Sequence, residues 1–298
     1  MNRTGKRMIK NSKISIKQLA GIDFEIIYAA SMKAFSDYPV PVVLSIQELQ
    51  YMLERRGCDL SLSFGAFDNN DLIGFVLNGT GDWQGNRTVY DTGTGLIKEY
   101  RRRGIATRLF KQSLPILRQN KIDQYLLEVI QENTSAFDLY QKEGLKVTRE
   151  FNCFVTPMSA IKLRDDVLND DFSIIRVENP DWQLFSSFWD FDPSWQNSID
   201  SIRRKIEHFT ILAALNDGTP VGYGIIENQT GDMPQIAIKK SYRRRGIATE
   251  LFRNLLSYSD SDELRIINTN SDSESFKKFA ESIHLHQSMD QYEMILQL

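Results

Sequence analysis

One segment of this chain occurs twice, almost without change. The first copy, YRRRGIATRLF, runs from Tyr100 to Phe110, and the second runs from Tyr242 to Phe252. The two copies differ only where Arg108 of the first is replaced by Glu250 in the second. A match of that length does not arise by chance, so the chain contains an internal duplication. Its two halves are therefore expected to repeat one fold.

The repeated segment predicts a loop that leads from a strand into a helix. Leu96 and Ile97 end an apolar, strand-forming run, and residues 236–238 do the same before the second copy. Gly104 permits a tight turn, and the apolar residues after it recur at helical spacing. The first amides of such a helix have no intrahelical partner, and the helix dipole adds partial positive charge. A pyrophosphate would fit this terminus, and the arginines add cationic, fork-shaped donors.

An alternative interpretation is that the three arginines form a solvated basic face or a patch for nucleic acid. The order of strand, arginines, glycine and helix is found twice, however, and this favours an anion site. Two other phosphate loops are excluded, because the sequence contains neither Gly-x-x-x-x-Gly-Lys-Ser/Thr nor Gly-x-Gly-x-x-Gly.

Composition narrows the class of protein. The 298 residues suggest two domains, and the net charge of −3 with a pI near 5.8 argues against a nucleic-acid partner. Cys58 and Cys153 are the only cysteines, too few for a disulfide framework or a structural zinc site, so no metal is expected. The basic N-terminal segment lacks the apolar core of a signal peptide, and no run is long and apolar enough to span a bilayer. We therefore expect a cytoplasmic protein with no membrane partner.

The pattern along the chain predicts the same order of elements in both halves. In the first half, helices are expected at 24–35, 46–53, from Gly104 to about 118 and at 133–143, with strands at 14–16, 60–67, 72–77, 88–97, 125–130 and 145–155 and a loop at 79–85. In the second half, helices are expected at 181–188, 198–206 and 273–282, and strands at 172–175, 210–215, 221–227, 236–238 and 264–267. An acid-rich linker near residues 165–171 divides the chain into domains of residues 1–165 and 166–298.

These motifs resemble those of the GCN5-related N-acetyltransferase (GNAT) superfamily, in a tandem arrangement similar to that of mycothiol synthase. The family pattern Gln/Arg-x-x-Gly-x-Gly/Ala is matched at residues 101–106 and again at residues 243–248. The segment LEVIQEN at residues 127–133, followed by Tyr140 and Gly144, looks like the family's fifth strand and the helix after it. The resemblance implies an α+β (mixed α/β) fold with two tandem acetyltransferase-fold domains, each a mixed, mostly antiparallel sheet with flanking helices.

The resemblance also implies acetyl-CoA as the co-substrate. The amides of residues 102–107 would hold its pyrophosphate, and the backbone before the loop would line the pantetheine arm, in the gap where two neighbouring strands splay. The cofactor-binding residues expected on this basis are Leu96, Ile97, Arg101, Arg102, Arg103, Gly104, Ile105, Ala106, Thr107 and Asn133 in the first copy, and Arg243, Arg244, Arg245, Gly246, Ile247 and Ala248 in the second.

Acetyl transfer to an amine needs a base for the ammonium and an acid for the departing thiolate. Tyr140 matches the family's acid beside the sulfur, although an ordinary core aromatic is the alternative. Glu128 lies twelve residues before Tyr140, a spacing similar to that in the bacterial ribosomal-protein N-acetyltransferases, and this resemblance implies that Glu128 is the base. A Glu in an otherwise apolar strand also suggests a carboxylate that faces a cleft. A solvated or paired Glu128 is equally compatible with the sequence, and Asp91, acting through a water, is the other candidate base.

The second copy departs from this pattern. Aligning Ile283 with Gly144 places Phe279 opposite Tyr140, Ile267 opposite Glu128 and Asp272 opposite Asn133. Neither Phe279 nor Ile267 can exchange a proton, so we expect a degenerate second domain that is structural or binds coenzyme. Cys153 is not expected to be a covalent nucleophile, because nothing near it in sequence activates it.

The resemblance implies that the acceptor enters between the first two helices and the hairpin that the strands at 60–67 and 72–77 form. This maps to residues 35–42, with Asp37, Tyr38 and two prolines, and to Asp82 and Trp83. Carboxylates and aromatics there would suit a cationic amine, and a proline-stiffened connector is the alternative. The predicted function is direct transfer of acetyl from acetyl-CoA to a primary amine of a small molecule or peptide. The alternative is a non-catalytic acyl-CoA-binding sensor or interaction protein.

Overall fold

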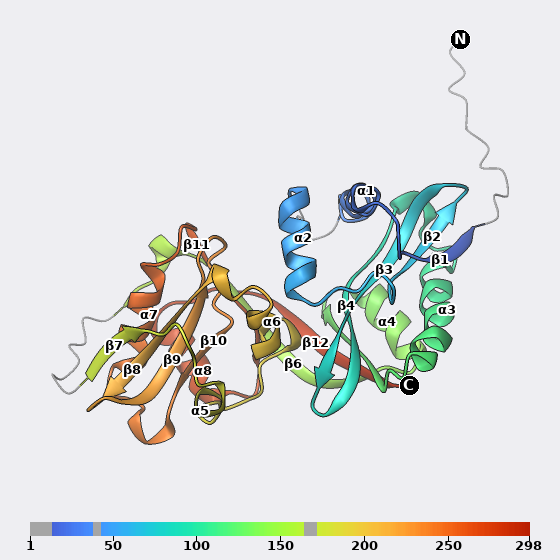
Figure 1. Ribbon diagram of the computed structural model, residues 1–298. Helices are drawn as coiled ribbons and strands as arrows, with labels where there is room; N and C mark the ends of the chain where they lie inside the picture. The colour runs from blue at the N-terminus through green and yellow to red at the C-terminus, as the bar shows by residue number, and fades with distance from the viewer. Residues whose placement is uncertain (1–13, 38–42, 164–171) are drawn as a thin grey trace, which may run out of the picture. The chain divides into compact units, whose positions relative to one another are not determined.

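The computed structural model describes residues 14–37, 43–163 and 172–298 (Figure 1). The predicted linker at 165–171 and the acceptor positions Tyr38 to Val42 lie outside these residues. By its internal contacts the chain forms two compact units. The N-terminal unit comprises Met1–Leu127 together with Leu296–Leu298, and the C-terminal unit comprises Glu128–Ile295.

The N-terminal unit is a sheet with helices on both faces. Its strands are β1 (Ser15–Gln18), β2 (Phe64–Asp68), β3 (Asp71–Trp83), β4 (Asn86–Leu96) and the start of β5 (Gln124–Ile130), and its helices are α1 (Phe24–Ala34), α2 (Ile46–Arg55) and α3 (Ile105–Gln119). The strands follow one another in chain order; all pairs are antiparallel except β4 with β5, which is parallel. The mixed, mostly antiparallel sheet is as predicted.

Alternating side chains of β3 pack the two faces of this sheet. Phe75 and Leu77 lie in one apolar cluster with Ile27 of α1 and Leu53 of α2. Helix α2 starts at a capping box, in which the Ser45 hydroxyl and the Glu48 carboxylate each accept a bond from the other residue's amide. On α3, Phe110 is buried and packs edge-on against Tyr125 of β5.

The predicted loop at residues 79–85 is wrong. Strand β3 continues to Trp83 and pairs with β4 from Gly74 to Trp83, so the two strands form a long hairpin whose turn is Gln84 and Gly85. The glycines in this stretch suggested a loop, yet Gly79 sits where a side chain would meet the carbonyl oxygen of Arg56 at 2.4 Å. A strand glycine here marks the close approach of a second backbone.

Two irregularities of β4 shape the edge that leads to the first loop. Thr92 is an extra residue opposite β3, because Asp91 pairs with Asn78 and Gly93 pairs with Leu77. Pairing with β5 ends at Tyr90 and Leu126, whereas β4 continues to Leu96. Beyond the bulge, β4 therefore keeps its hydrogen bonds to β3 alone, in line with the expected splay of two neighbouring strands.

The C-terminal unit contains two sheets. One has the order β10 (Gln235–Ile238), β9 (Thr219–Glu227), β8 (Phe209–Asn216), β7 (Phe172–Arg176), and in the other β6 (Lys146–Pro157) lies between β12 (Gln287–Gln297) and β11 (Glu263–Asn270). Its helices are α4 (Thr134–Lys142), α5 (Trp182–Ser186), α6 (Ile199–Arg203), α7 (Ile247–Leu256) and α8 (Glu274–Ser282). The helices predicted at 181–188 and 198–206 are present but shorter.

Helix α7, which follows the second loop, lies in an apolar cluster of the C-terminal unit. Leu251, Phe252 and Leu255 of α7 are fully buried against Val221 of β9 and Ile266 of β11. At roughly 25 cal/mol for each Å² of apolar surface removed from water, such side chains hold α7 firmly on the sheets. The N-terminus of α7 is thereby fixed in position.

Candidate functional site

The two Arg–Gly loops have the same backbone conformation. The second arginine of each has a left-handed φ, 61° at Arg102 and 62° at Arg244. The glycine that caps each helix is also left-handed, with φ of 69° at Gly104 and 80° at Gly246. Such a conformation is uncommon for a residue with a Cβ atom, and its repetition in both copies shows that the loop sequence specifies it.

Within the described part of the chain, both loops present helix amides that have no backbone acceptor or side-chain cap. The first intrahelical bond joins the Arg108 amide to the Gly104 carbonyl oxygen at 3.0 Å, and the Glu250 amide makes the same bond to Gly246 at 3.0 Å. The three amides before each of these precede the helical ladder, and neither helix has a side-chain cap. A Cβ atom built on Gly104 would meet no atom within 4 Å. At the first loop, the described residues therefore leave open space beside Gly104, which suits an anion site.

The first arginine of each loop is held by the protein itself. Arg101 Nε donates to the Leu96 carbonyl oxygen at 2.9 Å, and Arg243 Nε donates to the Ile238 carbonyl oxygen at 2.9 Å. Both terminal nitrogens of Arg101 also donate to the Asp37 carboxylate, at 2.7 and 3.0 Å. These contacts tie the loop to the end of the preceding strand and make the first arginine a brace for the loop.

The other two arginines of each loop face solvent in the same way. Arg103 stacks over the Tyr100 ring with its guanidinium carbon 5.2 Å from the ring centre, and Arg245 stacks over Tyr242 at 5.0 Å. Arg102 is exposed, as is Arg244 in the second copy. The positive charge around the open amides therefore comes from the second and third arginines.

The structure gives Asp37 a role that the sequence did not predict. Its carboxylate pairs with Arg101 and also with Lys98 Nζ at 3.2 Å. The hydrogen bond from Arg101 is the main cause that lowers the pKa of Asp37 to about 2. Two cations already pair with this carboxylate, and the role of Asp37 as an anchor for a cationic acceptor stays a prediction. Asp82, the other predicted carboxylate, accepts from the Gly85 amide at 3.1 Å in the β3–β4 turn, beside the buried Trp83.

Asp91, the alternative base, lies at the bulge of β4. It is 9% exposed, and its carboxylate accepts from the Gly93 amide at 3.0 Å and from the Thr94 hydroxyl at 2.6 Å. Both bonds fold the carboxylate back onto its own strand. Leu96 and Ile97, farther along, are half-buried, and the Ile97 amide donates to Ile73 at 2.9 Å.

Glu128, Asn133 and Tyr140 belong to the C-terminal unit, whereas Leu96, Ile97 and residues 101–107 belong to the N-terminal unit. Glu128 is half-buried on β5, and Tyr140 is 7% exposed on α4. Asn133 caps α4, because its side-chain oxygen accepts from the Ala136 amide at 3.3 Å. This cap is a structural reason for an amide side chain at that position.

The expected alignment of the second copy is one residue out of register. The Leu145 amide bonds the Tyr140 carbonyl oxygen at the end of α4, and the Leu285 amide bonds Ala280 in the same way after α8. Gly144 and His284 are the left-handed residues that end these helices. The counterparts of Tyr140, Asn133 and Glu128 are therefore Ala280, Ser273 and Asn268. Phe279, Asp272 and Ile267 do not correspond to the site residues, but the replacements still include no Tyr and no Glu.

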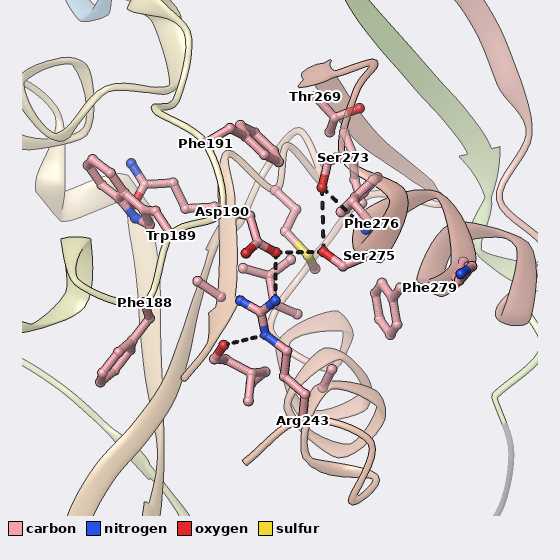
Figure 2. A pocket seen from close by; sticks show the side chains of 18 of the residues that line it. Phe188, Trp189, Asp190, Phe191, Arg243, Thr269, Ser273, Ser275, Phe276 and Phe279 are labelled. Carbon is pink, nitrogen blue, oxygen red and sulfur yellow. Dashed lines mark hydrogen bonds and ion pairs between the residues drawn. The ribbon is translucent and has the colours of Figure 1, made fainter. Parts of the chain in front are cut away.

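The second loop borders a cavity of about 1160 Å³ within the C-terminal unit (Figure 2). Its walls include Arg243, Gly246 and Ile247 of the loop and several aromatic side chains, namely Phe188, Trp189, Phe191, Phe276 and Phe279. Asp190 lies at the loop and accepts from Ser275 at 2.5 Å and from Arg243 at 2.9 Å. Burial raises the pKa of Asp190, but these two hydrogen bonds outweigh that effect and lower it. Asp190 thus holds Arg243 as Asp37 holds Arg101.

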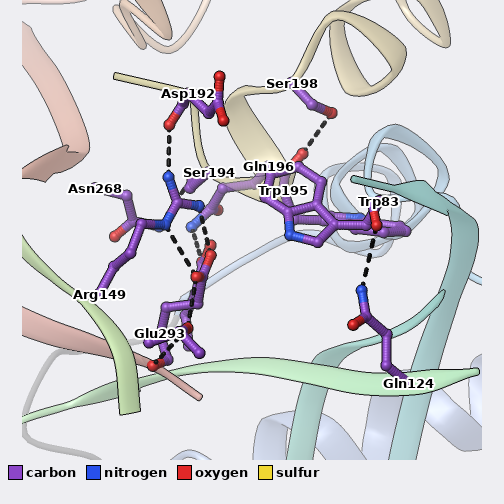
Figure 3. A network of polar contacts seen from close by, with 12 residues as sticks. Trp83, Gln124, Arg149, Asp192, Ser194, Trp195, Gln196, Ser198, Asn268 and Glu293 are labelled. Carbon is purple, nitrogen blue, oxygen red and sulfur yellow. Dashed lines mark hydrogen bonds and ion pairs between the residues drawn. The ribbon is translucent and has the colours of Figure 1, made fainter. Parts of the chain in front are cut away.

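A contact that the sequence did not reveal involves Glu128. The Gln196 side chain donates from Nε2 to Glu128 Oε2 at 2.7 Å, within the C-terminal unit. Figure 3 shows Gln196 on the segment that also meets Arg149, which pairs with Glu293 at 2.5 Å and donates to the Asp192 carbonyl oxygen. The sequence of this segment, SWQN at residues 194–197, carries no recognisable motif, so it gave no signal for the contact with Glu128.

Cys153 is fully buried on β6. Burial raises the pKa of its thiol to about 11, so the thiolate is scarce at neutral pH. This agrees with the expectation that Cys153 is not a nucleophile. In the described ranges no group of three or more His, Cys, Asp and Glu side chains could hold a metal ion.

Known proteins match both halves of the chain. The acetyltransferase (GNAT) family matches residues 24–145 and, again, residues 173–288. The chain belongs to this family. Each matched range contains one Arg–Gly loop, so this acetyltransferase-family protein carries two tandem GNAT domains, as predicted. The boundary at residues 165 and 166 stays a prediction.

Solved structures share this fold over nearly the whole chain. A tandem GNAT protein from the clavulanic acid biosynthesis pathway is 12% identical with a TM-score of 0.73, covering 96% of this chain and 98% of that one. A GCN5-related N-acetyltransferase from Sphaerobacter thermophilus is 14% identical with a TM-score of 0.71, covering 95% of both chains. At these identities the likeness shows the fold alone.

A curated relative is similar over a shorter stretch. N-alpha-acetyltransferase 30 of Schizosaccharomyces pombe is 32% identical over 83 residues, which are 28% of this chain. The match spans about half, 55%, of that relative's length. None of the helices in the described part of this GNAT protein is long and apolar enough to cross a membrane.

Proposed function

We propose that this protein transfers an acetyl group from acetyl-CoA directly to a primary amine, with the first copy as the catalytic one. The observation that carries the proposal is the first Arg–Gly loop, whose open helix amides and exposed arginines suit a pyrophosphate. In that role residues 102–107 bind the anion, and Arg101 braces the loop through Leu96 and Asp37. Acetyl-CoA supplies an activated acyl group as a thioester.

The proton transfers are assigned to Glu128 and Tyr140. Glu128 takes the proton of the acceptor ammonium, and the Tyr140 hydroxyl gives a proton to the departing thiolate. The half-buried position of Glu128 on β5 and the buried position of Tyr140 on α4 support these roles, because both groups are held by regular elements. Asp91 is the weaker candidate for the base, since its carboxylate is turned back to Gly93 and Thr94.

The acceptor class that we favour is a peptide α-amine. The name of the curated relative, an N-alpha-acetyltransferase, supports a peptide, and small-molecule amines are the other class to test. We propose a cytoplasmic enzyme, since the chain's two cysteines suit a reducing compartment.

For the second copy we propose a different function: it binds an acyl-CoA but does not transfer its acyl group. The cavity beside the second loop supports binding, because it joins the open amides of α7 to an aromatic interior. Ala280 stands where the first copy has Tyr140, so the second copy lacks the acid.

The decisive experiment is an acetyl-CoA consumption screen against peptides with different N-termini and against small amines. We expect CoA release to depend on one acceptor class and the product to carry acetyl on nitrogen, as shown by mass spectrometry. Calorimetry with acetyl-CoA alone provides the second measurement. Tight binding without turnover of any amine would favour the non-catalytic sensor, and the absence of binding would contradict both functions.

A further inference from the structure

The second half of the chain provides a hydrogen bond to Glu128. Gln196 Nε2 lies 2.7 Å from Glu128 Oε2, although the two residues are far apart in sequence. Glu128 belongs to the range that the family matches first, and Gln196 to the range that it matches second. The contact lies inside the C-terminal unit, so it joins residues of the two copies within one compact body.

The segment that carries Gln196 is buried and firmly held. Ser194, Trp195, Gln196 and Asn197 are all at most 6% exposed, and Trp195–Asn197 form a short 3-10 helix. Asn197 Nδ2 donates to the Ile267 carbonyl oxygen at 2.7 Å, and its own carbonyl oxygen accepts from Gln235 at 2.6 Å. These bonds hold the Gln196 side chain in place beside Glu128. Little conformational entropy is therefore lost when the hydrogen bond to Glu128 forms.

The charges around Glu128 make a neutral donor significant. The negative charges of Glu128 and of Asp290 on β12 act on Cys153 of β6, and both raise the pKa of its thiol. Arg149 lies on the same strand as Cys153 and pairs with Glu293 of β12. The Gln196 side chain is an uncharged donor, and its hydrogen bond favours the Glu128 carboxylate over the carboxylic acid without neutralising it.

We propose that Gln196 is a positioning residue for Glu128, so that the second copy of the duplication orients the base of the first. The inference rests on the proposed function, in which Glu128 is the base. It gives the degenerate half a role in the reaction that does not require that half to bind coenzyme. It also accounts for a buried glutamine that packing alone does not need, since an apolar side chain would fill the same space.

The test is a titration of Glu128 by NMR in the full-length protein, with carbon-13 in the glutamate side-chain carboxyls and the Glu128 signal assigned by Glu128→Gln. We expect Gln196→Ala to move the Glu128 titration midpoint upward by about one to two pH units, because a hydrogen bond to the charged form is lost. Asn197→Ala is the matched control, since it loosens the same segment without removing a donor to Glu128. An unchanged midpoint in Gln196→Ala, or an equal shift in Asn197→Ala, would overturn the proposal.

Kinetics separate this inference from the proposed function. With the acceptor from the screen, Gln196→Ala should lower kcat/KM about tenfold at pH 7 and displace its acidic limb as it displaces the NMR midpoint. If Glu128→Gln leaves the pH profile unchanged, Glu128 is not the base, and the proposed mechanism fails whatever Gln196 does. If Glu128→Gln abolishes the acidic limb and Gln196→Ala does not move it, only the positioning role fails.

Discussion

The two Arg–Gly loops share a backbone conformation, but the residues that follow them along the chain differ. Arg102 and Arg244 share a left-handed conformation to within a degree, and the first arginine of each loop braces the end of the preceding strand. Tyr140 follows the first loop along the chain, whereas Ala280 occupies the corresponding position after the second loop. Local sequence therefore preserves an anion site, whereas the chemistry depends on distant residues that have diverged.

The largest expected difference between the two copies concerns Tyr140. We expect Tyr140→Phe to lower kcat about a hundred- to ten-thousand-fold, because the thiolate loses its proton donor. Coenzyme affinity measured by calorimetry should stay the same. The control is Phe279→Tyr on α8, next to Ala280, the counterpart of Tyr140, and this variant should leave kcat unchanged. Full turnover in Tyr140→Phe would remove the distinction between the two halves.

Glycine substitutions test whether each loop binds coenzyme. Gly104→Val forces a β-branched residue into a left-handed conformation and places methyl groups in the open space before α3. We expect coenzyme affinity at the first loop to fall about tenfold or more, with loss of turnover. Gly246→Val should remove binding at the second loop and leave kcat largely intact. Calorimetric stoichiometry and steady-state kinetics on the two variants give the answer, and the idea fails if Gly246→Val abolishes turnover while the protein remains folded.

The smallest expected effect concerns the brace of the first loop. The pKa of Asp37 falls from 3.8 to about 2 through Arg101 and Lys98, so its ionised form stabilises the fold. Because the folded-state pKa is the lower one, this stabilisation is complete above pH 4 and disappears as the pH falls through about 2. Asp37→Asn should therefore lower Tm slightly at pH 7, and the difference from wild type should shrink toward pH 2. A difference that stays constant with pH would mean that the ion pair contributes nothing, as many exposed pairs do.

Local signals predicted much of this architecture. The glycine at the start of α3 and α7 and the apolar spacing after it fixed two helices, and turn residues marked the β2–β3 and β8–β9 hairpins. The strand at residues 79–83 was missed because its glycines look like a loop until the neighbouring backbone is present. The register of the second copy was missed because His284 adopts the left-handed turn that Gly144 makes in the first copy.

The partners of charged residues were beyond the reach of sequence. Arg101 meets Asp37, and Arg243 meets Asp190, through packing of segments that no motif connects. Gln196 reaches Glu128 for the same reason. Motifs describe which groups could do chemistry, but tertiary structure decides which of them already have a partner.

The pairing of strand β6 determines what would happen if one half of the chain were expressed alone. It is the last strand of the first half, yet it is hydrogen-bonded on one edge to β12 and on the other to β11, both from the second half. A product that stops at residue 165 would carry β6 with two bare edges and would lack the Glu293 partner of Arg149. The duplicated halves therefore share strand pairs, and removing or exchanging either half alone would leave strands without their partners.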